Sequence, residues 1–164
     1  MVTIRTERLV LRRATMDDLP AIHAILSDPQ GMRYWSSLPH ATLDQSAHWL
    51  RSMVEADPAT SDDFVVEHEG AVIGKLGCWA LPEIGFNFAR ATWGQGYASE
   101  AMTAFIDRRR ALGSPTALTA DVDPRNAASL RLLARHGFVE TGHASGTWQV
   151  GDELCDSIYL ALTF

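Results

Sequence analysis

The chain has 164 residues, of which 46% are hydrophobic, and its formal net charge is −6. This length and composition predict one folded domain over residues 1–164. The negative charge argues against broad nucleic-acid binding, which needs a basic surface. No apolar run reaches the roughly 18 residues of a membrane span, so no membrane partner is expected.

The two cysteines, Cys78 and Cys155, lie far apart in the sequence and form no CxxC pair. No histidine stands beside them at the spacing of metal ligands, so no metal site is expected. Because free cysteines are usually buried, we predict two buried, reduced thiols in a cytoplasmic protein.

The first third of the chain predicts a strand and two helices. Alternating apolar and polar residues indicate a strand over residues 4–13. Thr15, followed by two acidic residues, is a typical N-cap for a helix that stops before Pro29. A looser stretch over residues 30–41 follows, and a capping box at Thr42 begins the second helix.

The middle of the chain changes to the period of strands. Residues 64–68 and 71–74 predict a hairpin closed by the two-residue turn Glu69-Gly70. A further strand of alternating apolar residues is expected over residues 84–89.

The last part of the chain predicts two more helices and three strands. A long helix ends at Gly113 in the usual order of Gly before Pro. A strand follows over residues 117–122, and Asn126 is expected to cap a short helix. The last two strands are expected from Phe138 and over residues 157–164, joined by a polar loop.

This order of elements predicts an α/β (α+β) domain. Its sheet should be mixed and mostly antiparallel, with about seven strands and about four helices, because most neighbouring strands are joined as hairpins. The strand–helix–strand unit over residues 83–122 should supply a parallel pair.

A glycine turn, Trp93-Gly94-Gln95-Gly96, lies between a predicted strand and the long helix. Glycine lets the main chain adopt left-handed angles and approach a ligand closely. The start of the helix offers unpaired N–H groups and a favourable dipole, so a diphosphate fits there. By itself the pattern is equally consistent with a tight structural turn, since it is neither a P-loop nor GxGxxG.

The surrounding motifs resemble the GNAT acetyltransferase family, in order and over nearly the whole chain. The motifs are Glu83-Ile84-Gly85-Phe86, Trp93 through Ala101, Asn126 through Leu130, and Gly137-Phe138. The opening Thr6 through Arg12 is similar to the branch that acetylates the N-termini of ribosomal proteins. The resemblance implies a single GNAT-like domain with a splay in the centre of its sheet, acetyl-CoA as cosubstrate, and a possible homodimer.

The resemblance also implies a set of cofactor contacts. The residues from Gln95 to Ala98 should offer main-chain N–H groups to the pyrophosphate of coenzyme A, and the end of the preceding strand should pair with its pantetheine arm. Asn126 should contact the pantetheine or the diphosphate, and Ser129 should lie near the sulfur. The full predicted set is Phe88, Ala89, Arg90, Trp93, Gly94, Gln95, Gly96, Tyr97, Ala98, Asn126 and Ser129.

Acetyl transfer to an amine needs a neutral nitrogen, because a protonated amine has no free electron pair. A general base is therefore expected, with Glu83 as the first candidate and Asp121 as the second. Many family members place a Tyr where this chain has Leu132 and Leu133. The role of protonating the leaving thiolate then falls to Ser129 or to water.

The amine acceptor is expected to be a small molecule or a peptide. Tyr34 and Trp35 are predicted to line its pocket, and the loop over residues 142–153 to form the opposite wall. The missing Tyr leaves open an alternative, an acyl-CoA-binding sensor or interaction module with little or no catalysis. A hydrolase that uses Cys78 or Cys155 as nucleophile is a third hypothesis, but nothing in the sequence favours it.

Overall fold

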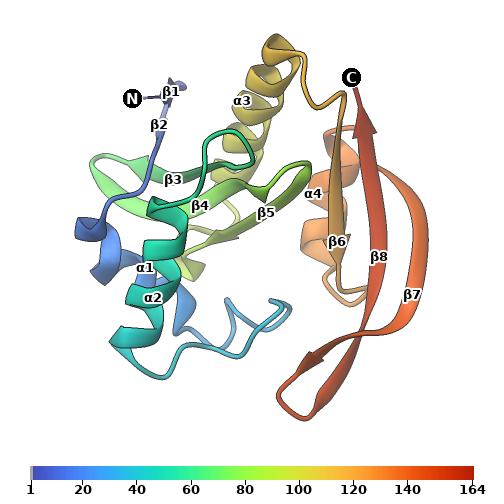
Figure 1. Cartoon of the computed structure of the whole chain (residues 1–164), viewed down its shortest axis with the longest axis horizontal. Coiled ribbons are helices and arrows are strands. Elements are labelled where there is room, and N and C mark those ends of the chain that lie inside the picture. Colours follow the sequence, from blue (N-terminus) through green and yellow to red (C-terminus); the bar gives the residue numbers. More distant parts are fainter. Residues whose placement is uncertain (1) are drawn as a thin grey trace.

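The computed structural model describes residues 2–164, which form one sheet of eight strands with four α-helices (Figure 1). The strands, in spatial order, are β1 (Thr3–Arg5), β2 (Leu9–Arg12), β3 (Asp62–His68), β4 (Ala71–Ala80), β5 (Glu83–Phe88), β6 (Ala117–Val122), β8 (Glu153–Thr163) and β7 (Val139–Val150). The α-helices are α1 (Leu19–Leu26), α2 (Leu43–Val54), α3 (Tyr97–Leu112) and α4 (Ala127–Arg135). In this part of the chain, no helix has the length and apolar character needed to cross a membrane.

The predicted mixed, mostly antiparallel sheet is confirmed, and its parallel pair is β5 with β6. The local signals behind it are confirmed as well. Glu69 and Gly70 both have positive φ angles, 50° and 81°, as a two-residue hairpin turn with matching twist requires. The Asn126 side chain accepts a hydrogen bond from the Ser129 N–H at the start of α4.

The first predicted strand, over residues 4–13, is in fact two strands. A turn separates β1 from β2, in which the Thr6 N–H donates to the Leu9 carbonyl at 3.0 Å. The carboxylate of Glu100, on α3, holds this turn by accepting hydrogen bonds from the Thr6 hydroxyl and the Arg8 N–H. The Glu100 side chain, far away in the sequence, therefore holds the turn that divides the predicted strand into β1 and β2.

The prediction of a polar loop over residues 142–153 is wrong. Most of it belongs to β7 and β8, and only a turn at Gly151 and Asp152 separates them. The residues of β7 are almost all exposed, so neither face of the strand needs apolar side chains. Without alternation of apolar and polar residues, the sequence carries no period-two signal.

The sheet has a hydrophobic core on each face. Successive strand residues point to opposite faces, so Phe64 and Val66 join a cluster with residues of α3 and α4. Val65, between them, joins a second cluster with residues of α1 and α2. All three side chains are fully buried, which explains the unbroken apolar run in β3.

Strands β5 and β6 pair at the start of β5. Glu83 pairs with Thr119, and the Thr119 N–H donates to the Pro82 carbonyl at 3.0 Å. Within residues 2–164, β5 has no other pairing with β6, and the two strands diverge from this point (Figure 1). This is the splay that the family resemblance implies.

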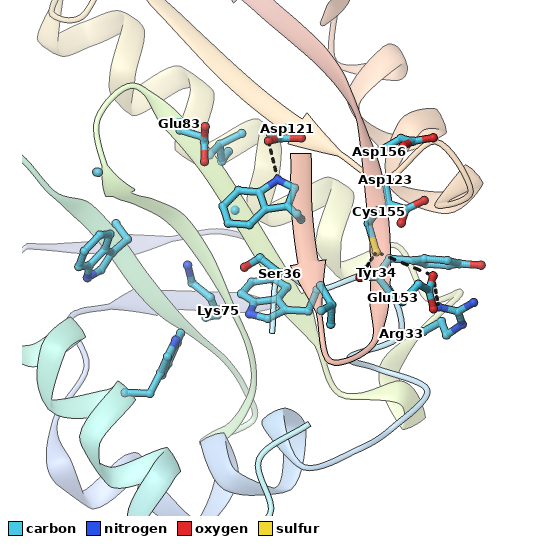
Figure 2. A pocket seen from close by; sticks show the side chains of 18 of the residues that line it. Arg33, Tyr34, Ser36, Lys75, Glu83, Asp121, Asp123, Glu153, Cys155 and Asp156 are labelled. Atoms are coloured by element: carbon cyan, nitrogen blue, oxygen red, sulfur yellow. Dashed lines mark hydrogen bonds and ion pairs between the residues drawn. The ribbon is translucent and has the colours of Figure 1, made fainter. Parts of the chain in front are cut away.

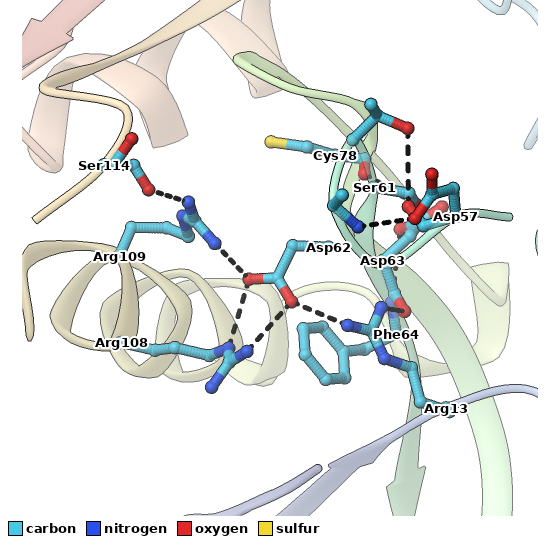
Figure 3. Close-up of polar contacts among 12 residues, drawn as sticks. Arg13, Asp57, Ser61, Asp62, Asp63, Phe64, Cys78, Arg108, Arg109 and Ser114 are labelled. Atoms are coloured by element: carbon cyan, nitrogen blue, oxygen red, sulfur yellow. Dashed lines mark hydrogen bonds and ion pairs between the residues drawn. The ribbon is translucent and has the colours of Figure 1, made fainter. Parts of the chain in front are cut away.

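Asp62, at the start of β3, is a buried carboxylate held by three arginines (Figure 3). Arg13 contacts it at 2.9 Å, Arg108 at 3.1 Å and Arg109 at 2.8 Å. Arg13 follows β2 and the other two lie on α3, so this one side chain ties three segments together. Burial by itself would raise the pKa of Asp62, but the hydrogen bonds from Arg108 and Arg109 outweigh it and lower the pKa.

We predict that Asp62→Asn lowers the free energy of unfolding by about 3–5 kcal/mol, because it leaves buried arginine charge without its partner. The lowered pKa sets the pH dependence. The ionised carboxylate stabilises the fold above its ordinary unfolded pKa, and this contribution is lost as pH falls through the folded value. The difference between wild type and variant should therefore be constant near neutral pH and shrink in acid.

Chemical denaturation over a range of pH measures this difference. Asp107→Asn is the matched control, since Asp107 lies on the exposed side of α3 and its ion pair spans 4.0 Å. It should change the unfolding free energy by less than about 0.5 kcal/mol. Equal effects of the two substitutions would contradict the role assigned to Asp62.

Candidate functional site

Two adjoining cavities open where β5 and β6 diverge, with volumes of about 1250 Å³ and 470 Å³. We call the larger one the groove and the smaller one the tryptophan pocket. Both are lined by Arg33, Tyr34 and Trp35, from the segment between α1 and α2. The predicted acceptor residues Tyr34 and Trp35 therefore lie on the wall that the two cavities share.

The glycine turn forms one end of the groove. Gly94 and Gly96 have φ angles of 73° and 80°, so both use the left-handed region that favours glycine. Helix α3 begins at Tyr97, and its first N–H groups have no acceptor within the helix. Such a helix start attracts anions through its free donors and its dipole, as a diphosphate would require.

Arg8 fixes the position of this turn, and the sequence analysis gave it no role. One guanidinium nitrogen donates to the Gln95 carbonyl at 2.9 Å, and Nε donates to Glu100 at 2.6 Å. The guanidinium also stacks over the Tyr97 ring at 4.6 Å. Arg8 belongs to the opening motif that resembles one GNAT branch, so that motif was the available signal.

Most of the predicted cofactor residues lie along the groove. The lining includes Phe88, Trp93, Gly94, Gly96, Tyr97, Ala98, Asn126 and Ser129. Ala89, Arg90 and Gln95 are not among its lining residues. For all eleven residues, a role in binding coenzyme A stays a prediction.

The structure shows what these three residues contact instead. The Ala89 N–H donates to the Ile73 carbonyl at 2.8 Å. Arg90 forms an ion pair with Asp28 at 3.1 Å. The Gln95 side chain donates to the Ala91 carbonyl, so it points back along its own loop.

The candidate bases lie together in the tryptophan pocket. Glu83 opens β5 and Asp121 lies on β6, and Figure 2 shows the two carboxylates at the same end of the pocket. Although Glu83 keeps contact with solvent, partial burial raises its pKa, and the negative charge of Asp121 raises it further. A carboxylate with a raised pKa is a stronger proton acceptor, as a general base requires.

Asp121 has a second partner in the pocket, Trp148 on β7. The indole Nε1 donates to the Asp121 carboxylate at 2.9 Å, which directs the ring over the pocket. Trp148, Val150 and Glu153 of the 142–153 segment thus line this pocket, although they do so from strands rather than from a loop.

The candidate acid lies on the other side of the shared wall. Ser129, on α4, lines the groove together with Leu132, one of the two leucines in the region where the family resemblance implies a Tyr. The structure therefore separates the candidates, with the bases in the pocket and Ser129 in the groove. Their roles in catalysis stay predictions.

The cysteines differ from each other in their surroundings. Cys78 is fully buried, and burial followed by the charge of Asp63 raises its pKa to about 12. That shift is the opposite of what a nucleophilic thiolate needs, so Cys78 is not an activated nucleophile. The prediction that both thiols are buried is wrong for Cys155, which is only half-buried and lines the tryptophan pocket.

Comparison with known proteins matches residues 8–139 to the acetyltransferase (GNAT) domain family. The chain belongs to the GNAT acetyltransferase family. Among curated proteins it is similar to an uncharacterized N-acetyltransferase, p20, of Bacillus licheniformis. The two are 28% identical over 151 residues, covering 87% of this chain and 85% of the relative.

Two solved structures show how closely the fold agrees. An acetyltransferase of Salmonella typhimurium that modifies the N-terminal serine of ribosomal protein L7/L12 aligns with a TM-score of 0.89, 17% identity and 99% coverage of each chain. A spermidine N-acetyltransferase of Vibrio cholerae, solved with coenzyme A and spermine, aligns with a TM-score of 0.83, 21% identity and 96% coverage of each chain. At these identities the likeness concerns the fold.

As a GNAT acetyltransferase, the protein transfers an acetyl group from acetyl-CoA to an amine. The glycine turn provides a test of where the cosubstrate binds. We predict that Gly96→Val raises the KM for acetyl-CoA roughly tenfold or more, because a β-branched residue at φ 80° is strained and shifts the turn. Steady-state kinetics with varied acetyl-CoA measures the change.

Gly113→Val is the matched control. Gly113 has a φ angle of 70° at the opposite end of α3, so the backbone strain is similar but the groove is remote. Both variants should lose similar stability in thermal unfolding, and only Gly96→Val should change the KM. An unchanged KM in folded Gly96→Val protein would contradict the assignment of the turn to acetyl-CoA.

Proposed function

We propose that the chain acetylates a primary amine by direct attack on the thioester, with Glu83 as the general base. The observation that carries this proposal is the placement of Glu83 in the tryptophan pocket, with a pKa raised by partial burial and by Asp121. The groove would hold acetyl-CoA and the pocket would hold the amine, so the two substrates would meet at the shared wall.

Glu83, directly or through water, takes a proton from the ammonium form of the acceptor. The neutral nitrogen forms a bond to the acetyl carbonyl carbon, the carbon–sulfur bond breaks, and its electron pair leaves with the sulfur. The nitrogen loses a second proton as the amide forms and keeps its third. Of the two protons released, one ends on the sulfur and the other passes to solvent, which returns Glu83 to its ionised form and leaves an N–H amide and free coenzyme A.

No covalent enzyme intermediate is required, because the thioester is already activated. A free thiol has a pKa of about 8.5, so the leaving sulfur needs little help. Ser129, which lines the groove, or a water molecule supplies its proton, so turnover does not require a Tyr in the region of Leu132 and Leu133. A main-chain N–H near Phe88 would stabilise the developing oxyanion.

We predict that Glu83→Gln lowers kcat by about 10²–10⁴-fold, the usual contribution of a general base. The wild-type rate should rise with pH through a pKa above the ordinary carboxyl value, because Glu83 acts only when ionised. That limb should be missing from the profile of the variant. The measurement is coenzyme A thiol release against pH, with an amine that supports turnover.

Glu140→Gln serves as the control, since Glu140 is an exposed β7 residue that does not line the pocket. It should leave both kcat and the pH profile as they are. If Glu83→Gln keeps the wild-type profile, Glu83 is not the base and Asp121 becomes the candidate. Binding of acetyl-CoA without thiol release for every amine would instead support the alternative of an inactive acyl-CoA-binding module.

A further inference from the structure

The pocket concentrates the aromatic residues of the chain. Four of the five tryptophans line it, namely Trp35, Trp49, Trp79 and Trp148, together with Tyr34. Trp79 and Trp148 are 59% and 42% exposed, which is unusual for residues that mostly bury their rings. Large exposed rings gathered around one cavity indicate a surface prepared for a ligand rather than for the core.

The same pocket carries an excess of negative charge. Five carboxylates line it, those of Glu83, Asp121, Asp123, Glu153 and Asp156, against two cationic side chains, Arg33 and Lys75. Lys75 is buried and forms an ion pair with Asp63 at 2.8 Å, so its charge is used outside the pocket.

Ion pairs neutralise only part of this negative charge. Arg125 contacts Asp123 at 2.6 Å and Glu153 at 2.5 Å, and Figure 2 shows Arg33 beside Glu153. Among residues 2–164, no cationic side chain pairs with the other three carboxylates of the pocket. They are Glu83, Asp121 and Asp156.

An amine with one charge does not account for this surplus. The nitrogen that attacks must be neutral, and the proton that it loses is the one that Glu83 takes. Asp121 and Asp156 then still line the pocket without a counter-charge, since their hydrogen-bond donors, the Trp148 indole and the Gly146 N–H, are neutral. A second, permanent positive charge on the acceptor would match them, and the tryptophan faces attract such a cation through their π-systems.

We propose that the acceptor is a small molecule with two cationic groups. The first is the primary amine that is acetylated beside Glu83. The second is a cation that lies against the tryptophan faces and offsets the negative charge of Asp121 and Asp156. A pocket of about 470 Å³ has the size of a small-molecule site. This inference rests on the proposed function, since it assumes that the tryptophan pocket holds the acceptor.

The test uses two amines that differ only in the second charge. One is an alkylamine whose remote end is a trimethylammonium group. In the other, of the same length, an uncharged tert-butyl group replaces it. We call them the cationic probe and the neutral isostere after this remote group. Neither remote group can be acetylated, so each probe offers one reactive nitrogen. We expect kcat/KM for the cationic probe to exceed that for the neutral isostere by about tenfold or more. One cation–π or ion-pair contact in a partly desolvated site contributes enough binding energy for this ratio.

Two substitutions locate the second charge. Asp156→Asn and Trp148→Phe should each lower the ratio of kcat/KM for the cationic probe to kcat/KM for the neutral isostere several-fold. Asp152→Asn is the matched control, because Asp152 lies in the turn of the same β7–β8 hairpin but does not line the pocket. It should keep the wild-type preference.

A binding measurement separates this inference from the proposed function. Quenching of tryptophan fluorescence reports on the pocket whether or not turnover occurs. Tighter binding of the cationic probe that is lost in Asp156→Asn supports the inference, whether or not turnover is seen. If no amine releases thiol from acetyl-CoA, that result contradicts the proposed function alone. Equal binding and equal kcat/KM of the two probes would overturn the inference while leaving acetyl transfer intact.

Discussion

The site of this protein depends on the single place at which β5 and β6 pair. Parallel strands normally continue their ladder, but here Glu83 and Thr119 are the one pair within residues 2–164. Because the strands then diverge, the sheet opens instead of closing, and the groove and the tryptophan pocket form on either side of a shared wall. The hairpin of β7 and β8 extends from the β6 side and brings Trp148 back over the opening.

Two carboxylates on neighbouring parts of the sheet show how the fold divides stability from chemistry. Asp62 lies among three arginines, which hold its pKa below the ordinary value and lock β3 against α3. Glu83 has no cationic partner among the described residues, and its pKa is raised by partial burial and by a second carboxylate. The same chemical group is therefore a structural anchor in one place and, in the proposed mechanism, a proton acceptor in the other, according to which charges surround it.

Arg8 links the N-terminal strands to the glycine turn beside the groove. It supports the glycine turn through the Gln95 carbonyl and the Tyr97 ring, while Glu100 draws it toward α3. The same carboxylate interrupts the first strand, so the division into β1 and β2 and the fixed position of the turn have one cause. A loop that binds a diphosphate through main-chain N–H groups needs such support, because its own glycines leave the backbone free to move.

Local patterns in the sequence determined the elements whose signals lie within a few residues, such as the Glu69-Gly70 turn, the Asn126 cap and the end of α3 at Gly113. The motifs around Trp93 and Asn126 were enough to place the chain in its family. Only the tertiary structure decided that residues 142–150 are strand and that Arg8 supports the glycine turn. It also decided that four tryptophans line one pocket with three carboxylates that have no cationic partner among the described residues. These features arise from contacts between residues far apart in the chain, and no periodicity or short motif records such contacts.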